Sequence, residues 1–324
     1  MNRSLTYAKA INEGLHQAMQ LCDDVVVLGQ LVDYPSGIFG TTTGLVDEFG
    51  PNRVQDFPVS ENLMTATAMG ASLTGLRPVI VHQRLDFMLY SLDSITNWLS
   101  LWRFKSNRHC NAPVTIRAIV GKGWGQGPQH SKSLHAWFAH LPGLRVAVPA
   151  TADDAKGLLL ESIFGETPAI FIEGRGLFSM AASVPEQPYR VRFGQAAVRR
   201  PGKDVTVVAI GMMVPLALRV ATELETEGID MEVVDPRTLS PLDLDSICNS
   251  VGKTRRLVVA DPAWASFGAA SEIIARVAER MGDDLKANPA RVCFPDSHTP
   301  MSSALEPKYY PGESDLRDAV CKLF

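Results

Sequence analysis

The sequence predicts an α/β protein made of two doubly wound domains, each with a mainly parallel sheet between helices. Short uninterrupted apolar runs, such as residues 25–28 and 114–120, are typical of strands buried on both faces of a parallel sheet. These runs alternate with helical segments, which is the order that builds such a sheet. A stretch bearing Pro and Arg at residues 183–194 reads as a linker. We therefore expect domains at residues 1–182 and 195–324.

In the first domain, an N-terminal helix is followed by alternating strands and helices. Residues 5–21 place Ala8, Ile11, Leu15 and Ala18 on one helical face. The predicted strands are apolar runs bounded by Gly, Pro or charged residues, and they span residues 25–28, 53–57, 79–81, 114–120, 144–149 and 168–173. The predicted helices span residues 45–49, 61–75, 92–102 and 155–164.

The second domain repeats the alternation over a shorter length. Its predicted strands span residues 204–211, 231–234, 256–260 and 290–294. Its predicted helices span residues 214–227, 243–250, 268–281 and 315–323, and the third of these is clearly amphipathic.

Composition excludes several classes of protein. The chain has 324 residues, of which 46% are hydrophobic and 20% charged, as expected for a globular protein with large cores. A net charge of −4 gives no reason to expect nucleic acid or an anionic membrane as partner. The longest apolar run, residues 205–218, is interrupted by Pro215 and is too short to span a membrane. With no signal-like start and five scattered cysteines, we expect a cytoplasmic location.

Glu61 is the first candidate functional residue. Ser60 is expected to cap a helix that has Glu61 in its first turn, where the helix dipole stabilises a carboxylate. The simplest interpretation is a cap residue. The helix that follows is, however, made almost entirely of small residues, namely Thr65, Ala66, Thr67, Ala68, Gly70, Ala71 and Ser72. Such a helix suits a tight buried interface, and a carboxyl at its mouth can share a proton with a ligand.

His130 is the second candidate. It follows a glycine-rich loop at the carboxyl end of a predicted strand, and histidine is suited to proton transfer near neutral pH. The loop lacks the Walker pattern and fits the dinucleotide fingerprint badly. A structural role for His130 is the alternative. His135 and His140 are five residues apart on the next helix, which is a poor spacing for a shared metal.

Many separate motifs follow one another in a fixed order along the chain. They are Phe57-Pro-Val-Ser-Glu61, Gly75-Leu-Arg-Pro78, Phe87 with Asp93 and Asn97, Gly127-Pro-Gln-His-Ser131, Ala139-His-Leu-Pro-Gly143, Pro149 with Asp154-Ala-Lys-Gly-Leu158, Asp235-Pro-Arg-Thr-Leu239 with Pro241, and Lys253-Thr254. Together they resemble the beta subunit of the thiamine-diphosphate-dependent first component of 2-oxo acid dehydrogenases, of the pyruvate, branched-chain and acetoin type. The resemblance covers essentially the whole chain and extends to transketolases.

The resemblance implies a role for each candidate residue. Glu61 matches the glutamate that hydrogen-bonds the aminopyrimidine N1′ of thiamine diphosphate and so activates the cofactor. Phe87 matches the aromatic residue on the pyrimidine ring, although a plain core role stays open, and Gln83 is a further cofactor-binding candidate. His130 matches the histidine that faces the substrate. The first domain would be the pyrimidine-binding domain, and the second the transketolase C-terminal type.

The resemblance also implies a partner. The family binds the diphosphate through Mg²⁺ held by a Gly-Asp-Gly motif, which this sequence lacks. An alpha-type subunit would therefore supply that half of the site in an α2β2 heterotetramer. A lipoyl acyltransferase is a further candidate partner.

Three departures from the family pattern stand out. Gln30 replaces an acid linked to communication between paired sites. The loop that carries a K⁺ site in the family reads Ser162-Ile-Phe-Gly-Glu-Thr-Pro168, so backbone carbonyls of Ser162, Ile163 and Gly165 are weaker K⁺ candidates. Arg84 and Leu85 stand just before Phe87, where the dehydrogenases tend to be aromatic. Arg84 would suit an anionic or polyhydroxy acceptor, and a surface or interface charge is the alternative.

The predicted function is thus a subunit that decarboxylates a 2-oxo acid and passes the acyl or aldehyde unit to a lipoyl carrier. Two alternatives stay open. One is a transketolase-like or acyloin-forming subunit that transfers the unit to another carbonyl compound, for example in sugar biosynthesis. The other is a non-catalytic regulatory homologue. The presence together of Glu61, Phe87 and His130 favours an enzyme.

Overall fold

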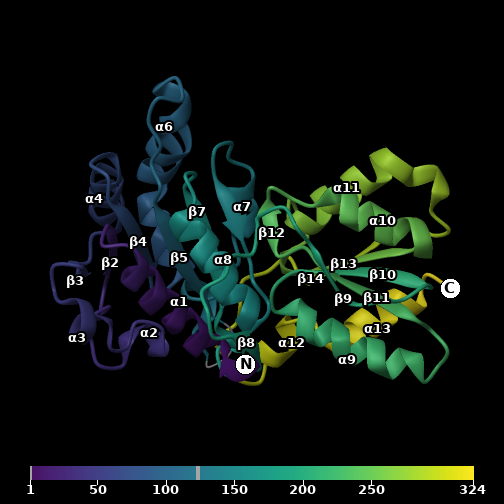
Figure 1. Ribbon diagram of the computed structural model, residues 1–324. Coiled ribbons are helices and arrows are strands. Elements are labelled where there is room, and N and C mark those ends of the chain that lie inside the picture. The colour runs from purple at the N-terminus through teal and green to yellow at the C-terminus, as the bar shows by residue number, and fades with distance from the viewer. Residues whose placement is uncertain (1, 122–124) are drawn as a thin grey trace. The chain divides into compact units, whose positions relative to one another are not determined.

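The computed structural model describes residues 2–121 and 125–324. The chain forms two compact units, one of residues 1–121 and 137–193 and the other of residues 122–136 and 194–324 (Figure 1). Each unit contains a mainly parallel sheet with helices, which confirms the predicted fold class. Residues 122–136 group with the second unit although their neighbours on both sides belong to the first. Where the boundaries of independently folding domains fall stays a prediction.

The first unit is built on six parallel strands that adjoin in the order β6-β7-β5-β4-β2-β3. Their bounds are β2 (Val25–Gly29), β3 (Val54–Asp56), β4 (Arg77–His82), β5 (Thr115–Val120), β6 (Arg145–Ala147) and β7 (Ala169–Gly174). In β2, β5 and β7 every residue is buried. The continuous apolar runs of the sequence are therefore strands covered on both faces, as predicted.

Helices form a layer on each face of this sheet. The helices α1 (Tyr7–Leu21) and α8 (Ala152–Phe164) pack against each other in front of the strands (Figure 1). Helix α4 (Glu61–Leu73) packs on β4 with η1 (Leu89–Ser91) and the π-helix η2 (Ser94–Leu99). The short elements are α2 (Gly37–Gly40), α3 (Leu45–Phe49), α5 (Leu85–Met88), α6 (Ser100–Lys105), α7 (His135–Ala139) and η4 (Arg175–Leu177).

An antiparallel ribbon in the first unit was not predicted. Strand β1 (Asn2–Thr6) pairs with β8 (Ala181–Pro185), so that Thr6 lies opposite Ala181. The sequence analysis placed Leu5 and Thr6 in a helix and residues 183–185 in a linker, and it predicted no strand in either place. Both strands are short, and each depends on a partner far away along the chain, so local periodicity cannot reveal them.

The second unit has a five-stranded sheet in the order β14-β13-β10-β11-β9, parallel except for β9. Helices α9 and α13 cover one face, and α10 and α11 the other (Figure 1). The bounds are β9 (Ala197–Arg200), β10 (Val205–Ala209), β11 (Met231–Asp235), β13 (Leu257–Trp264), β14 (Ala290–Phe294), α9 (Met213–Glu225), α10 (Leu244–Thr254), α11 (Ala269–Met281) and α13 (Glu313–Cys321). Shorter elements are η3 (Gly127–Gln129), β12 (Thr238–Ser240), η5 (Gly282–Asp284) and α12 (Glu306–Tyr309).

A charged pair is buried in the core of the first unit. Arg117 of β5 donates from Nε to Glu173 Oε1 over 2.6 Å and from Nη2 to Glu173 Oε2 over 2.9 Å. Both side chains are 0% exposed. Two hydrogen bonds in the fork geometry of arginine offset much of the cost of removing both charges from water.

His82, the last residue of β4, is also buried, with 1% of its surface exposed. Among the described residues, neither of its ring nitrogens has a hydrogen-bond partner. Burial alone lowers the pKa of His82 to about 3, because a charged imidazole would be desolvated there.

We expect His82 to make the protein sensitive to acid. In the unfolded chain His82 takes up a proton near pH 6.5, whereas the folded chain resists it down to about pH 3, so stability is lost as the pH falls through this window. The slope approaches about 1.4 kcal/mol per pH unit. Urea unfolding between pH 7 and 4.5 should therefore show a flatter pH dependence for His82→Leu than for the wild type. The exposed His140, changed to Gln, serves as control. Equal slopes in all three proteins would contradict this account.

Candidate functional site

The first unit has a candidate ligand site where its strand order reverses. From β2 the chain continues to β3 on one side and then returns to β4 on the other. Ligands of open α/β sheets bind outside the carboxyl ends of the strands at such a switch point. Gly29 of β2 lies opposite Asp56 of β3 and opposite Val81 of β4. The segments that follow these three residues therefore leave the same edge of the sheet.

Three predicted site residues belong to these segments. Gln83 follows β4, and its Nε2 donates to the backbone oxygen of Gln30, which follows β2, over 3.3 Å. Phe87 lies in α5, just beyond Gln83, and is partly exposed. Glu61 is the first residue of α4, the helix that follows β3, and is also partly exposed. The fold thus directs Glu61, Gln83 and Phe87 to the ligand-binding edge of one sheet.

The start of α4 differs in one detail from the prediction. Ser60 occupies the N-cap position, but its side chain makes no capping hydrogen bond. Near this end of the helix Val59 is 82% exposed and Leu63 is 53% exposed. Farther along, a Cβ atom added at Gly70 would meet no atom within 4 Å. The outer face of α4 is therefore apolar, small and uncovered in the single chain, which is typical of an interaction surface.

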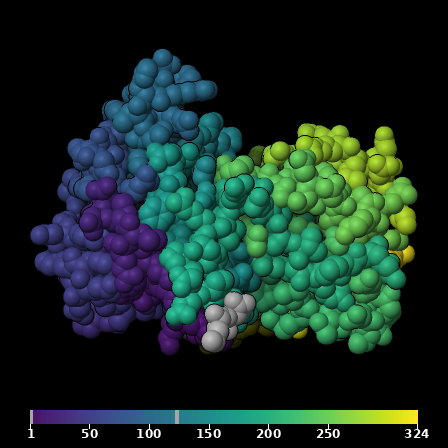
Figure 2. Space-filling model, viewed as in Figure 1, coloured from purple at the N-terminus to yellow at the C-terminus, as the bar shows by residue number. Residues whose placement is uncertain are grey.

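A second apolar surface lies along the segment that ends in α6. This segment projects from the body of the first unit (Figures 1 and 2). Tyr90 is 74%, Trp98 43%, Leu101 40% and Phe104 86% exposed. We call these four residues the α6 patch. Large aromatic side chains at such exposure indicate a surface that a partner covers.

His130 belongs to the second unit, whereas Glu61, Gln83 and Phe87 belong to the first. It caps η3 and is partly exposed, and its Nδ1 lies 3.2 Å from the backbone oxygen of Gln126. The backbone N–H of Gly125 donates to Glu306 Oε2 over 3.1 Å. Gly127 has φ +66°, a conformation that favours glycine. These contacts hold the described part of the loop onto its own unit.

Sequence reasoning missed a group of three buried, hydrogen-bonded side chains, two of which follow His130 in the sequence. His135 and Asp261 are 0% exposed, and His135 Nε2 donates to Asp261 Oδ1 over 2.8 Å. Ser133 Oγ lies within hydrogen-bonding distance of His135 Nδ1, at 3.1 Å. The order is that of a hydrolase triad, but Ser133 is itself only 6% exposed, so its hydroxyl is not placed to attack a substrate. The Asp261 partner lies 126 residues away and gave no local signal.

The K⁺ candidates lie at the end of α8. Arg77 Nη1 donates to the backbone oxygens of Ile163, over 3.2 Å, and Gly165, over 3.0 Å. Ser162 Oγ donates to Leu158 O over 2.7 Å. A cation of the chain itself therefore binds two of the carbonyls assigned to K⁺. A K⁺ site here stays a prediction, and it would require Arg77 to move.

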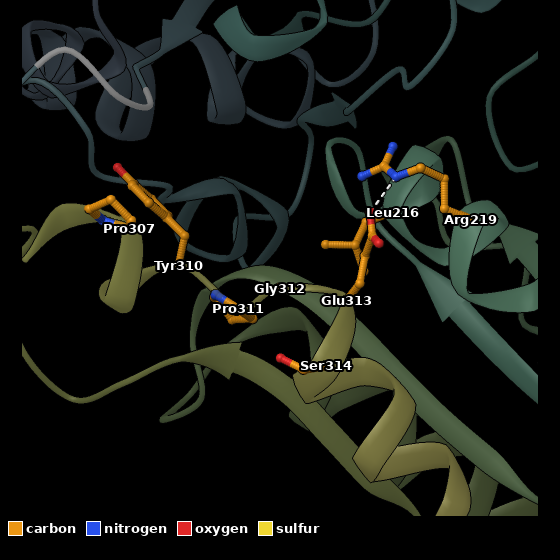
Figure 3. A pocket seen from close by; sticks show the side chains of 8 residues that line it. All are labelled: Leu216, Arg219, Pro307, Tyr310, Pro311, Gly312, Glu313 and Ser314. Carbon is orange, nitrogen blue, oxygen red and sulfur yellow. Dashed lines mark hydrogen bonds and ion pairs between the residues drawn. The ribbon is translucent and has the colours of Figure 1, made fainter. Parts of the chain in front are cut away.

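A pocket of about 540 Å³ lies in the second unit, against the start of α13. Arg219 and Glu313 form an ion pair across it (Figure 3). None of the candidate residues lines it, so we assign it no part in the function. In the described ranges, residues 2–121 and 125–324, no helix is long and apolar enough to cross a membrane.

Comparison with known proteins defines the class. The sequence model of the family of transketolase pyrimidine-binding domains matches residues 3–180. The sequence model of the family of transketolase C-terminal domains matches residues 194–316. A solved structure described as a split gene transketolase, inactive beta4 tetramer, is 26% identical, covers 98% of both chains and has a TM-score of 0.77.

Two relatives narrow the class further. The acetoin:2,6-dichlorophenolindophenol oxidoreductase subunit beta of Cupriavidus necator is 39% identical over 99% of this chain and 98% of its own. The pyruvate dehydrogenase E1 component subunit beta of Bacillus subtilis is 37% identical over 98% of each. This chain belongs to the family of beta subunits of thiamine-diphosphate-dependent 2-oxo acid dehydrogenases, as its motifs predicted. It is a subunit of an oxidoreductase of this class.

Proposed function

We propose that this chain and an alpha-type subunit together form an enzyme that decarboxylates a 2-oxo acid and passes the product to a lipoyl carrier. The observation that carries the proposal is the position of Glu61. It begins α4 at the switch point of the first unit, at the same edge of the sheet from which the segment that bears Gln83 and Phe87 leaves. A carboxyl, an amide and a partly exposed aromatic ring are the groups that an aminopyrimidine needs from a protein.

The residues present fit thiamine diphosphate. When bound, this cofactor supplies a nucleophilic carbon and an electron sink. Glu61 would hold a proton at N1′ of its aminopyrimidine, and Phe87 would pack on that ring. Gln83 offers a donor and an acceptor to the edge of the ring. His130 would hold or move a proton at the substrate.

The diphosphate must be bound elsewhere. The sequence has no Gly-Asp-Gly motif, and the described residues include no group of three or more His, Cys, Asp or Glu that could hold a metal. The uncovered face of α4 and the α6 patch support a partner that supplies both Mg²⁺ and the diphosphate site. A relative solved as a beta4 tetramer is described as inactive, which further supports this division of labour. We infer an α2β2 heterotetramer.

Calorimetry with thiamine diphosphate and Mg²⁺ tests the proposal. The complex with the alpha subunit should bind the cofactor tightly, and the isolated chain weakly or not at all. No binding by the complex would instead favour a regulatory homologue. Tight, Mg²⁺-dependent binding by the chain alone would show that the division between subunits is wrong.

We expect His130→Ala to separate catalysis from cofactor binding. The cofactor dissociation constant should change little, because Glu61, Phe87 and the partner determine it. The single-turnover rate should fall about 10²- to 10⁴-fold, since general acid–base assistance is lost. His140→Ala, an exposed histidine, is the control. A joint loss of affinity and rate would mean that His130 only anchors its loop, and an unchanged rate would remove it from the mechanism.

A second candidate function has one observation in its favour. Arg84, next to Gln83, is 5% exposed at the edge that carries the site. A buried cation there would suit an anionic carbonyl compound as the acceptor of the acyl or aldehyde unit, in place of a lipoyl group. Analysis of products formed from a 2-oxo acid with a carbonyl acceptor, or with a lipoyl domain, would separate the two.

A further inference from the structure

Two arginines of the first unit share one aromatic ring. The guanidinium carbon of Arg84 lies 5.2 Å from the centre of the Phe39 ring, and that of Arg175 lies 4.7 Å from the same centre. Phe39 belongs to the segment after β2, Arg84 follows β4, and Arg175 begins η4 directly after β7. Three segments that leave the carboxyl edge of one parallel sheet therefore bring two cations together.

This pair of cations has an electrostatic cost. Arg84 is 5% exposed and Arg175 is partly buried. Burial and the positive charge of Arg175 lower the pKa of Arg84, and burial also lowers the pKa of Arg175. Asp86, 6% exposed, opposes these effects at Arg84. Two guanidinium groups gathered around one aromatic ring repel each other, and a bound anion would relieve this repulsion.

The backbone that carries Phe39 is held in an unusual conformation. Ile38 has φ 41° and Phe39 has φ 59°, both in the left-handed region. A β-branched residue such as Ile38 is disfavoured there, and residues of this kind gather at ligand sites. Phe39 nevertheless stays 41% exposed, and its ring meets that of Phe178 edge-on at 6.3 Å. The loop thus presents the ring to the two guanidinium groups.

We propose that Arg84 and Arg175 bind one oxyanion group, a carboxylate or a phosphate, of the substrate at this site. The guanidinium fork matches both groups, and contact with the Phe39 ring holds the two guanidinium groups at one place. Arg84 directly follows Gln83, so the site adjoins the proposed cofactor site. The identity of the ligand as a substrate rests on the proposed function, but binding of the oxyanion does not.

The test is binding of inorganic phosphate and of succinate to the full chain, by calorimetry, without cofactor or alpha subunit. Succinate carries only carboxylates, so the tighter of the two identifies the preferred group. We expect Arg84→Gln and Arg175→Gln each to weaken that binding about 10- to 100-fold, the effect of losing a charge-assisted pair. Arg84→Lys should give an intermediate loss, because the charge remains without the fork.

Arg103→Gln is the matched control, because Arg103 is an exposed arginine of the same unit. Far-ultraviolet circular dichroism checks that each variant is folded. If Arg84→Gln unfolds, anion binding by Arg175→Gln tests the proposal, because Arg175 is only partly buried. The proposal is overturned if neither anion binds the wild type, or if both Gln variants bind as the wild type does. This experiment contains no cofactor, so its failure would say nothing about the binding of thiamine diphosphate to the complex. The two proposals can therefore fail independently.

Discussion

Glu61→Gln is expected to remove most of the activity of the assembled enzyme, about 10²- to 10⁴-fold, and to leave fold and assembly intact. Glutamine keeps the size and the hydrogen-bonding shape of the side chain but cannot exchange a proton with N1′ of the cofactor. The position supports this role, because Glu61 begins α4 at the ligand-binding edge of the first unit. Exchange of the cofactor's carbon-2 proton, followed by NMR on the bound cofactor, should slow in parallel with turnover.

The competing interpretation is that Glu61 only complements the dipole of α4. That role is worth about 0.3–1 kcal/mol, so its loss would lower the melting temperature slightly and leave proton exchange alone. Glu279→Gln, an exposed glutamate of α11, controls for loss of a negative charge. Near-normal carbon-2 exchange in the Glu61 variant would refute the assignment.

The largest effect on stability is expected at the buried pair of β5 and β7. Glu173→Ala should cost about 3–5 kcal/mol, because Arg117 would stay charged, 0% exposed and without its carboxylate. The double change Arg117→Met with Glu173→Leu should cost much less, since two apolar side chains replace two desolvated charges. Urea unfolding of the single and double variants measures both values.

A surface pair provides the matched comparison. Arg276 and Glu272 are 3.9 Å apart on α11, with side chains 39% and 68% exposed. Glu272→Ala should change the free energy of unfolding little, because exposed pairs are weak. If Glu173→Ala were as mild as Glu272→Ala, the Arg117–Glu173 pair would not stabilise the core as its geometry indicates.

The sequence predicted those parts of the fold that local patterns encode. Strand β14 (Ala290–Phe294) and helix α3 (Leu45–Phe49) have the predicted bounds, because apolar runs and glycine boundaries are local signals. The pairing of β1 with β8 was missed, since neither strand is long enough to show its period. Irregular backbone at Ile38 was also invisible, because a β-branched residue predicts the opposite conformation.

The candidate site was predictable only in part. Glu61, Gln83 and Phe87 could be assigned from motifs, and the strand order explains why they leave one edge. The contact of Arg84 and Arg175 with the Phe39 ring could not be predicted, because the three residues follow three different strands. Tertiary contacts of this kind have no signature in spacing along the chain.

The hydrogen bond between His135 and Asp261 has a consequence for how this protein can be divided. A fragment that starts at residue 194 contains Asp261 but not His135, because residues 122–136 come from between the segments of the first unit. The carboxylate of Asp261 would keep its bond from the backbone N–H of Ala270 but lose the imidazole. We therefore expect the C-terminal portion to be more stable when that short upstream peptide is included. Gene fusions, domain exchanges or separate expression are expected to work better with the peptide than without it.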